Sequence, residues 1–348
     1  MLFSQSLVGN SRLAKAQFDE VRRARMANNA HEAMFQAANQ AAGLRVNEGL
    51  IPGDVYQEFD NVTQTRFRSD DGDTFINDLL PLSRSVNIGK LVSKFRQASD
   101  AGYVQTSMTG QIGVKMDQVE YSYDGAIVPV HDTGFGRNWR EWNAQQSEGF
   151  DALIDDQREC VASIRSHVAD QFLDGHVDAD GNVIVVDGTS WGGMRNDTRV
   201  AQATLVFDFT DDTQTGDAIK KAFITEVRDV LWITNNCQKD VTYYISREIA
   251  SVWENRFNNE HGEKKIEQEI AGLMGVASVK VTNKLTGNQI MGFPLSEDAV
   301  RPVVGMAVNT VAMPRTAYNS NYQFAVWAAI GFQVKTDYFG KTCAIYAS

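Results

Sequence analysis

The sequence lacks the features that mark secreted and membrane-spanning proteins. No apolar run approaches the roughly 18 residues that a transmembrane helix needs. The first residues, Met-Leu-Phe-Ser-Gln, supply neither the basic segment nor the apolar segment of a signal peptide. We therefore expect neither a signal peptide nor a membrane span.

Cysteine is also scarce, with Cys160, Cys237 and Cys343 far apart in the chain. An odd number of cysteines at these separations predicts buried thiols in a reducing compartment, not a disulfide framework. The five histidines show no H-x-x-x-H or H-E-x-x-H spacing. We therefore expect no metal site and no cofactor.

Positive charge is in deficit, because 33 Lys and Arg residues face 44 Asp and Glu residues, for a net charge of −11. This balance argues against a protein that wraps nucleic acid by neutralising phosphates. An acidic protein can still lie beside nucleic acid without binding it tightly. With 348 residues, 43% hydrophobic and 22% charged, the chain can form a large core and is expected to contain two subdomains.

The strongest pattern in the sequence predicts a long amphipathic helix over residues 138–173. Asn138 is the expected N-cap, and Gly175 follows the last apolar position, where a helix commonly ends. An unbroken helix of this length measures about 50 Å, with Gly149 as a possible kink. The apolar positions of its stripe are Phe150, Leu153, Ile154, Cys160, Val161, Ile164, Val168 and Phe172. A sheet can lie against such a helix.

The segments before this helix have little core of their own. Residues 11–42 are rich in helix formers, and residues 43–82 contain the Gly and Pro residues of an extended arm. Residues 85–116 predict a polar hairpin with a turn at residues 98–102 and a second limb from residue 103. A two-stranded hairpin that is polar on both faces needs another surface to lie on.

The segments after the long helix alternate between strands and helices. Residues 215–314 predict a compact α/β subdomain, including a strand at residues 303–311. At the end of the chain, residues 324–335 and 341–347 predict a closing hairpin around the turn of residues 336–340.

From about residue 75 onward, this order of elements resembles the major capsid proteins of tailed bacteriophages with the HK97-type fold, an α+β fold. Residues 326–348 resemble the closing strands of podophage-type coat proteins. The parts that the resemblance implies are an N-terminal helix and extended arm (1–84), an extended hairpin loop (85–116), a peripheral domain (117–214) with its spine helix (138–173), an α/β axial domain (215–314) and closing strands of the peripheral domain (315–348).

The resemblance implies a structural protein without catalytic activity. Its hexamers and pentamers are expected to form the icosahedral head that encloses a double-stranded DNA genome, with no sequence-specific DNA contact. The absence of a segment as large as a fused scaffold domain implies a separate scaffolding protein, and a portal and a cement protein are further expected partners. The expected location is the virion capsid, assembled in the host bacterial cytoplasm without a membrane.

Charge suggests how neighbouring subunits meet. Positive residues concentrate on the predicted hairpin, and acidic residues lie on the polar side of the predicted spine helix. We expect the hairpin of one subunit to dock on the spine of the next, each exposed pair contributing about 0.2–1 kcal/mol. The residues of this predicted interface are Lys90, Lys94, Arg96 and Lys115 on the hairpin, and Asp151, Asp155 and Glu159 on the spine.

Two other functions are compatible with parts of the sequence. An encapsulin-like nanocompartment shell shares the fold, but the long segment of residues 1–84 favours the virus. The G-x-S-x-G pattern at residues 188–192 matches the nucleophile elbow of a serine hydrolase, which must enter a helix. The residues from Gly193 onward show no helical stripe, so we expect Ser190 to have no catalytic role.

Overall fold

The computed structural model describes residues 12–41, 73–113, 115–147, 152–178, 180–255, 265–317 and 319–348. The chain separates into two compact units, residues 1–63 and residues 64–348. In the first unit, α2 (Arg12–Ala41) confirms the helix predicted over residues 11–42. Met26 and Met34 are exposed on α2, so this helix has no continuous buried stripe.

The second unit contains two principal sheets. The long sheet has the strand order β1 (Arg84–Ser85), β11 (Val300–Ala312), β12 (Tyr322–Val334) and β4 (Val130–Arg137). The five-stranded sheet has the order β7 (Ala201–Ala203), β13 (Ile345–Ala347), β10 (Ile290–Phe293), β8 (Val241–Ile245) and β9 (Val276–Val281). Two further pairs are β2 (Val92–Ala98) with β3 (Tyr121–Ile127), and β5 (Val185–Val186) with β6 (Thr189–Ser190).

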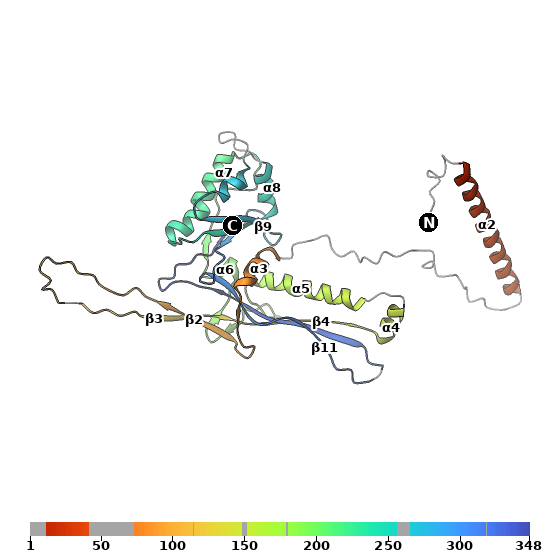
Figure 1. Ribbon diagram of the computed structural model, residues 1–348, viewed down its shortest axis with the longest axis horizontal. Helices are drawn as coiled ribbons and strands as arrows, with labels where there is room; N and C mark the ends of the chain where they lie inside the picture. The colour runs from red at the N-terminus through yellow and green to blue at the C-terminus, as the bar shows by residue number, and fades with distance from the viewer. Residues whose placement is uncertain are drawn as a thin grey trace. The chain divides into compact units, whose positions relative to one another are not determined.

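Helices accompany both sheets in this unit. Figure 1 shows α5 running alongside the long sheet, and α7 and α8 grouped with the five-stranded sheet. The Thr215 side chain caps α7 by accepting a hydrogen bond from the Ala218 N–H. The described helices are α3 (Asp73–Leu79), α4 (Trp139–Ser147), α5 (Ala152–Asp174), α6 (Gly193–Asn196), α7 (Gly216–Ala222), α8 (Arg247–Asn255), α9 (Ile266–Ala271), the 3₁₀ turn η2 (Leu80–Leu82) and two π-helical segments, η3 (Phe223–Arg228) and η4 (Val230–Thr234).

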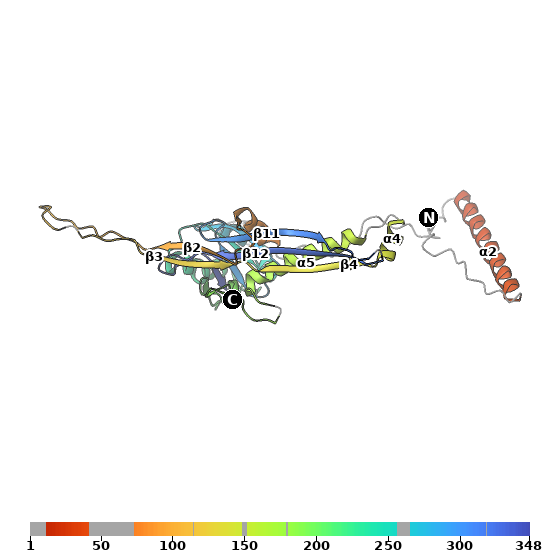
Figure 2. The ribbon, with the colours of Figure 1, turned by 90° about the horizontal axis from the view of Figure 1, so that it is seen from below.

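The long sheet is built on the antiparallel pair β11 and β12, each of 13 residues. The helix α5 packs on this sheet and buries Ile164, Val168 and Phe172, which lie on the predicted apolar stripe. Figure 2 shows α5 beside β4, β11 and β12. Ile154 was placed on the same stripe, but it is exposed, so the buried part of the stripe lies in the second half of the helix.

An aromatic cluster around Phe172 joins the two sheets. The Phe172 ring lies 4.7 Å from the Phe332 ring of β12 and 5.7 Å from the Phe293 ring of β10, measured between centroids. It also lies 5.4 Å from the ring of Phe75 on α3. All four side chains are buried. One helix residue therefore contacts the long sheet, the five-stranded sheet and α3.

The predicted spine helix is described as two helices, α4 and α5, and residues 148–151 between them lie outside the described residues. Both predicted ends are confirmed. The Asn138 side chain accepts a hydrogen bond from the Arg140 N–H at 2.9 Å, and Gly175 has a left-handed φ of +100° just after α5. None of the helices in the described residues has the length and apolarity needed to cross a membrane.

The predicted hairpin is present, but its register was wrong. β2 pairs with β3 from Val92–Ile127 to Ala98–Tyr121, so the chain returns at residue 121 and not at residue 103. Beyond the paired strands, the Ser99 N–H donates to the Glu120 carbonyl at 2.9 Å. The predicted tight turn at residues 98–102 is therefore the start of a long tip spanning residues 99–120.

Both predicted closing strands exist, but they do not form a hairpin. β12 belongs to the long sheet, whereas β13 lies in the five-stranded sheet between β7 and β10. The turn between them is confirmed, because the Asp337 carboxylate accepts hydrogen bonds from the Phe339 and Lys341 N–H groups. The strand predicted over residues 303–311 was assigned to the axial subdomain, but β11 lies in the long sheet.

Part of the predicted extended arm is helical. Residues 42–72 lie outside the described residues, whereas Asp73–Leu79 form α3, which inserts Phe75 and Leu79 into the core. The Asp78 carboxylate on α3 accepts hydrogen bonds from the Tyr244 hydroxyl and the Lys280 ammonium of the five-stranded sheet. The predicted arm therefore ends in the helix α3, whose side chains form part of the core.

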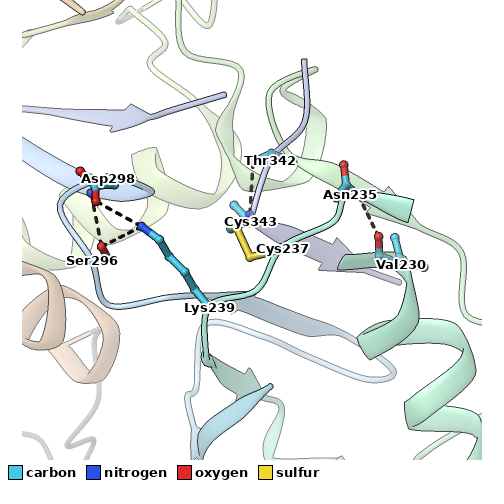
Figure 3. The surroundings of a disulfide bond; sticks show 9 residues. Val230, Asn235, Cys237, Lys239, Ser296, Asp298, Thr342 and Cys343 are labelled. Atoms are coloured by element: carbon cyan, nitrogen blue, oxygen red, sulfur yellow. Dashed lines mark hydrogen bonds and ion pairs between the residues drawn. A yellow bond between two sulfur atoms is a disulfide. The ribbon is translucent and has the colours of Figure 1, made fainter. Parts of the chain in front are cut away.

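The prediction of three free thiols was wrong. Cys237 and Cys343 form a disulfide across 106 residues of sequence, whereas Cys160 is a half-buried free thiol. Figure 3 shows the disulfide between the segment after η4 and the segment that leads into β13. The crossing of the chain between the two sheets is what brings these distant cysteines together.

We predict that Phe172→Ala destabilises the unassembled subunit by about 3–5 kcal/mol, because it leaves a cavity where both sheets and α3 meet. Urea unfolding followed by circular dichroism measures the change. Phe339→Ala, at an exposed phenylalanine, is the matched control and should change stability by less than about 0.5 kcal/mol. Equal stability of the two variants would show that the cluster does not join the sheets.

Candidate assembly interface

The base of the β2–β3 hairpin is fixed to the core of its own subunit. Gly331 of β12 lies against the backbone of β3, and a Cβ at this position would collide with the Ile127 carbonyl oxygen. At the other strand, the Gln97 side-chain amide donates to the Thr336 hydroxyl at 2.7 Å. The hairpin is therefore held at its root by close backbone packing and polar contacts.

A half-buried arginine strengthens this attachment. Arg199 donates to the Gly125 carbonyl on β3 at 2.9 Å and pairs with the Asp197 carboxylate at 2.7 Å. Burial acts to raise the pKa of Asp197, but the hydrogen bonds and charge of Arg199 hold it below its usual value. The pair thus remains ionised and orients the guanidinium toward the hairpin.

The tip of the hairpin, residues 99–120, exposes apolar side chains. Val104 is 90% exposed, and Met108 and Met116 are still more exposed. Ser99 and Gly102 are held by hydrogen bonds to other residues of the same tip. Exposed apolar groups of this number on one projecting element are typical of a surface that another molecule covers.

The predicted cations of the hairpin have partners within their own subunit. The Lys94 ammonium lies 2.5 Å from an Asp187 carboxylate oxygen. Arg96 lies over the Tyr121 ring and Lys115 over the Tyr103 ring, at 5.5 and 4.6 Å from the centroids. Lys90 is exposed at the start of the hairpin. Sequence reasoning placed the charges correctly on the hairpin but missed these aromatic partners.

The predicted acidic partners lie on or next to α5. Asp155 lies 3.8 Å from Arg158, while Asp151 lies outside the described residues. Glu159 is half-buried on the same helix. A different carboxylate, Asp156, receives two hydrogen bonds from Arg137 of β4 at 2.6 and 2.8 Å. Within one subunit the structure does not bring the hairpin cations to these acids, so docking between subunits stays a prediction.

The G-x-S-x-G segment is followed by a short helix, contrary to expectation. α6 (Gly193–Asn196) is a single turn, and Gly193 has a φ of +83° where it packs against the end of α5. The Ser190 carbonyl accepts a hydrogen bond from Arg199. Among the hydrogen bonds between described residues, none joins the Ser190 hydroxyl to a histidine. The segment thus serves to place Arg199 and the end of α5.

Three histidines meet at the long sheet, which no sequence spacing indicated. The His131 ring on β4 lies 5.3 Å from that of His167 on α5 and 6.2 Å from that of His176. The His131 Nε2 lies 3.3 Å from the Ile330 carbonyl oxygen. Burial, and then the neighbouring histidines, lower the pKa of His176 to about 3. Burial also lowers the pKa of His131, so the fold favours the uncharged form of both His131 and His176.

We predict that acid destabilises the subunit through His176. Between pH 6.5 and about 3 the unfolded chain binds a proton at this residue and the folded chain does not, so the free energy of unfolding falls as the pH falls. The expected slope is about 1.4 kcal/mol per pH unit. Urea unfolding of His176→Gln at pH 7, 6 and 5 should show a shallower slope than the wild type.

The control for this measurement is His31→Gln, at an exposed position of α2. It should leave the pH dependence of unfolding unchanged. A His176→Gln slope equal to that of the wild type would mean that His176 is protonated in the folded state.

A family model matches residues 39–347, which is most of the chain. The chain belongs to the family of unknown function DUF6260. No curated protein sequence matches it.

Solved structures resemble this DUF6260 member over most of the chain. The capsid of Myoviridae phage XM1 matches with a TM-score of 0.63 at 12% identity, over 86% of this chain and 99% of that chain. The capsid of a native GTA particle has a TM-score of 0.55 at 11% identity, over 87% and 98% of the two chains. A Mycobacterium phage Che8 structure has a TM-score of 0.54 at 9% identity, over 84% and 96%. The DUF6260 chain therefore has the α+β, HK97-like fold of these phage capsids.

Proposed function

We propose that this chain is the major capsid protein of a tailed bacteriophage, a structural subunit that self-assembles into an icosahedral head. The observation that carries the proposal is a capsid-type fold whose long hairpin ends in an apolar tip with no core in its own subunit. A tip of this kind is stabilised only when a neighbouring molecule covers it.

The difference between the hairpin tip and the surface that covers it supports closed rings of subunits. The hairpin tip and the surface that covers it are different parts of the chain, so each contact is heterologous, and heterologous contacts repeat into rings when the rotation closes. Hexamers and pentamers are such rings. The fixed root of the hairpin gives each subunit a defined direction toward its neighbour.

We assign the parts of the fold to capsid domains as follows. The five-stranded sheet with α7, α8 and α9 forms the axial domain, and the long sheet with α4 and α5 forms the peripheral domain. The sheet order moves β7 and β13 into the axial domain and β11 into the peripheral domain, so the expected limits of 215–314 do not follow the sheets.

The proposal includes partners and a location. A separate scaffolding protein guides assembly, a portal occupies one vertex and a cement protein binds the outer surface. The head encloses double-stranded DNA without sequence-specific contact, in keeping with a net charge of −11. Assembly takes place in the bacterial cytoplasm, and the mature location is the virion capsid.

We predict that Met108→Glu combined with Val104→Glu prevents shell formation while leaving the subunit folded. Both side chains are exposed on the tip, so a charge there disturbs only a contact with another subunit. Sedimentation of the protein co-expressed with its neighbouring genes measures shell yield, and circular dichroism measures folding. Met274→Glu, at an equally apolar exposed position outside the hairpin, is the control and should still form shells. Normal shells from the tip variant would contradict the proposal.

The charge-docking model gives a separate prediction. Lys90→Glu together with Lys94→Glu should reduce shell yield, as should high salt in the wild type, because exposed ion pairs are screened. Since Lys94 also pairs with Asp187, the variant must be compared with Lys90→Glu/Lys94→Glu/Asp187→Lys, which restores that internal pair. Rescue by Asp187→Lys would show that the loss came from the internal pair and not from docking.

A further inference from the structure

A cationic pocket lies where the hairpin root, the disulfide and the turn of residues 336–340 meet. Its volume is about 460 Å³, within the range of ligand sites. Its walls come from residues 95–98, 235–239 and 335–343, together with Asp298 and Ala299. Figure 3 shows the Cys237–Cys343 disulfide and Lys239 on this side of the fold. The pocket is therefore built by segments that the disulfide fixes relative to one another.

Positive charge dominates this pocket in an otherwise acidic chain. Four cations, Arg96, Lys239, Lys335 and Lys341, line it against two carboxylates. One carboxylate, Asp298, is occupied by Lys239 at 3.3 Å. The other, Asp337, is occupied by the N–H groups of its own turn. An excess of cations remains after these internal contacts.

Lys335 carries most of this excess. It is half-buried at the end of β12, and no carboxylate of the described residues lies within ion-pairing distance of its ammonium. The cations Arg301 and Arg84 lie near it on the long sheet. Burial, and then the charge of Arg301, lower the pKa of Lys335, and the charges of Asp298 and Glu297 oppose this shift only in part. An anion placed against this ammonium would relieve both the desolvation and the repulsion.

The chain itself contains a segment of the complementary charge. Residues 208–217 include four aspartates and no lysine or arginine. Asp208 and Asp211 hold this loop in shape by accepting hydrogen bonds from Thr210 and Thr213. Asp212 is exposed at its centre. The loop does not line the pocket of its own subunit, so only a second copy can bring it there.

We propose that the pocket receives the loop of residues 208–217 from a neighbouring copy of this chain, with an aspartate carboxylate on the Lys335 ammonium. This inference rests on the proposed shell function, which supplies neighbouring copies at high density. The two carboxylates on the pocket wall leave a net charge of +2, which suits one or two side-chain carboxylates better than a polyanion such as DNA.

Carbodiimide cross-linking of assembled shells tests this contact, because the reagent joins an amine to a carboxylate only when the two touch. Shells are assembled from a mixture of ¹⁴N-labelled and ¹⁵N-labelled subunits, treated and analysed by mass spectrometry. The expected product links Lys335 to an aspartate of residues 208–217 in peptides that carry both isotopes. Lys335→Glu should lose this product and reduce shell yield at least tenfold, and Lys335→Glu/Asp212→Lys should restore part of the yield.

Lys221→Glu is the control, since it makes the same change of charge at an exposed lysine outside the pocket and should leave yield unchanged. Shells that form without a mixed-isotope link at Lys335, or with a link to a carboxylate elsewhere, would overturn this inference and leave the proposed function standing. Failure of the wild-type protein to form any shell would overturn both.

Discussion

The contact on which the rest of the structure depends is the packing of Phe172 between the two sheets. Its ring meets Phe332 of the long sheet, Phe293 of the five-stranded sheet and Phe75 of α3. Because protein interiors are close-packed, three elements that share one ring cannot move independently. The long sheet and the five-stranded sheet thus act as one body, and the direction in which the hairpin leaves that body is fixed. A subunit that lends an element to its neighbour needs this rigidity.

The hairpin, unlike the core around Phe172, is fixed only at its root. Its root is fixed by Gly331 and by the half-buried Arg199, but its tip holds Val104, Met108 and Met116 in solvent. The free energy of covering these groups is available only in contact with another molecule. Folding therefore completes the body of the subunit, and on the proposed function association with a neighbour covers the tip. The same division explains why apolar side chains are buried at the root of the hairpin, as at Ile127, but exposed at its tip.

The sequence predicted those parts of the fold that local patterns specify. Ile164 and Val168 recur at helical spacing, and Asn138 and Gly175 have the chemistry of helix ends, so the start of α4 and the end of α5 follow from short-range rules. The partner of β2 could not be predicted, because two of the three residues on its inward face, Ser93 and Gln97, are polar, and a strand without apolar alternation carries little signal for its register. The histidine cluster and the aromatic partners of Arg96 and Lys115 join residues from separate elements, and single-sequence spacing cannot reveal them. The order of elements read from local patterns carried the family resemblance, and the resemblance in turn implied how those elements are arranged.

The cysteine prediction failed for the same reason, because the two bonded cysteines come from separate elements of the fold. Spacing predicts a disulfide only where the fold is a small loop framework, whereas Cys237 and Cys343 are 106 residues apart. They meet because the chain leaves the long sheet after β12 and crosses to the five-stranded sheet to form β13. That crossing is short, so it brings Lys335, Lys341 and the disulfide to one place beside the root of the hairpin. The concentration of positive charge there is thus a consequence of topology, because the passage between the two sheets brings Lys335 and Lys341 to the place where Arg96 of β2 and Lys239 after η4 also lie.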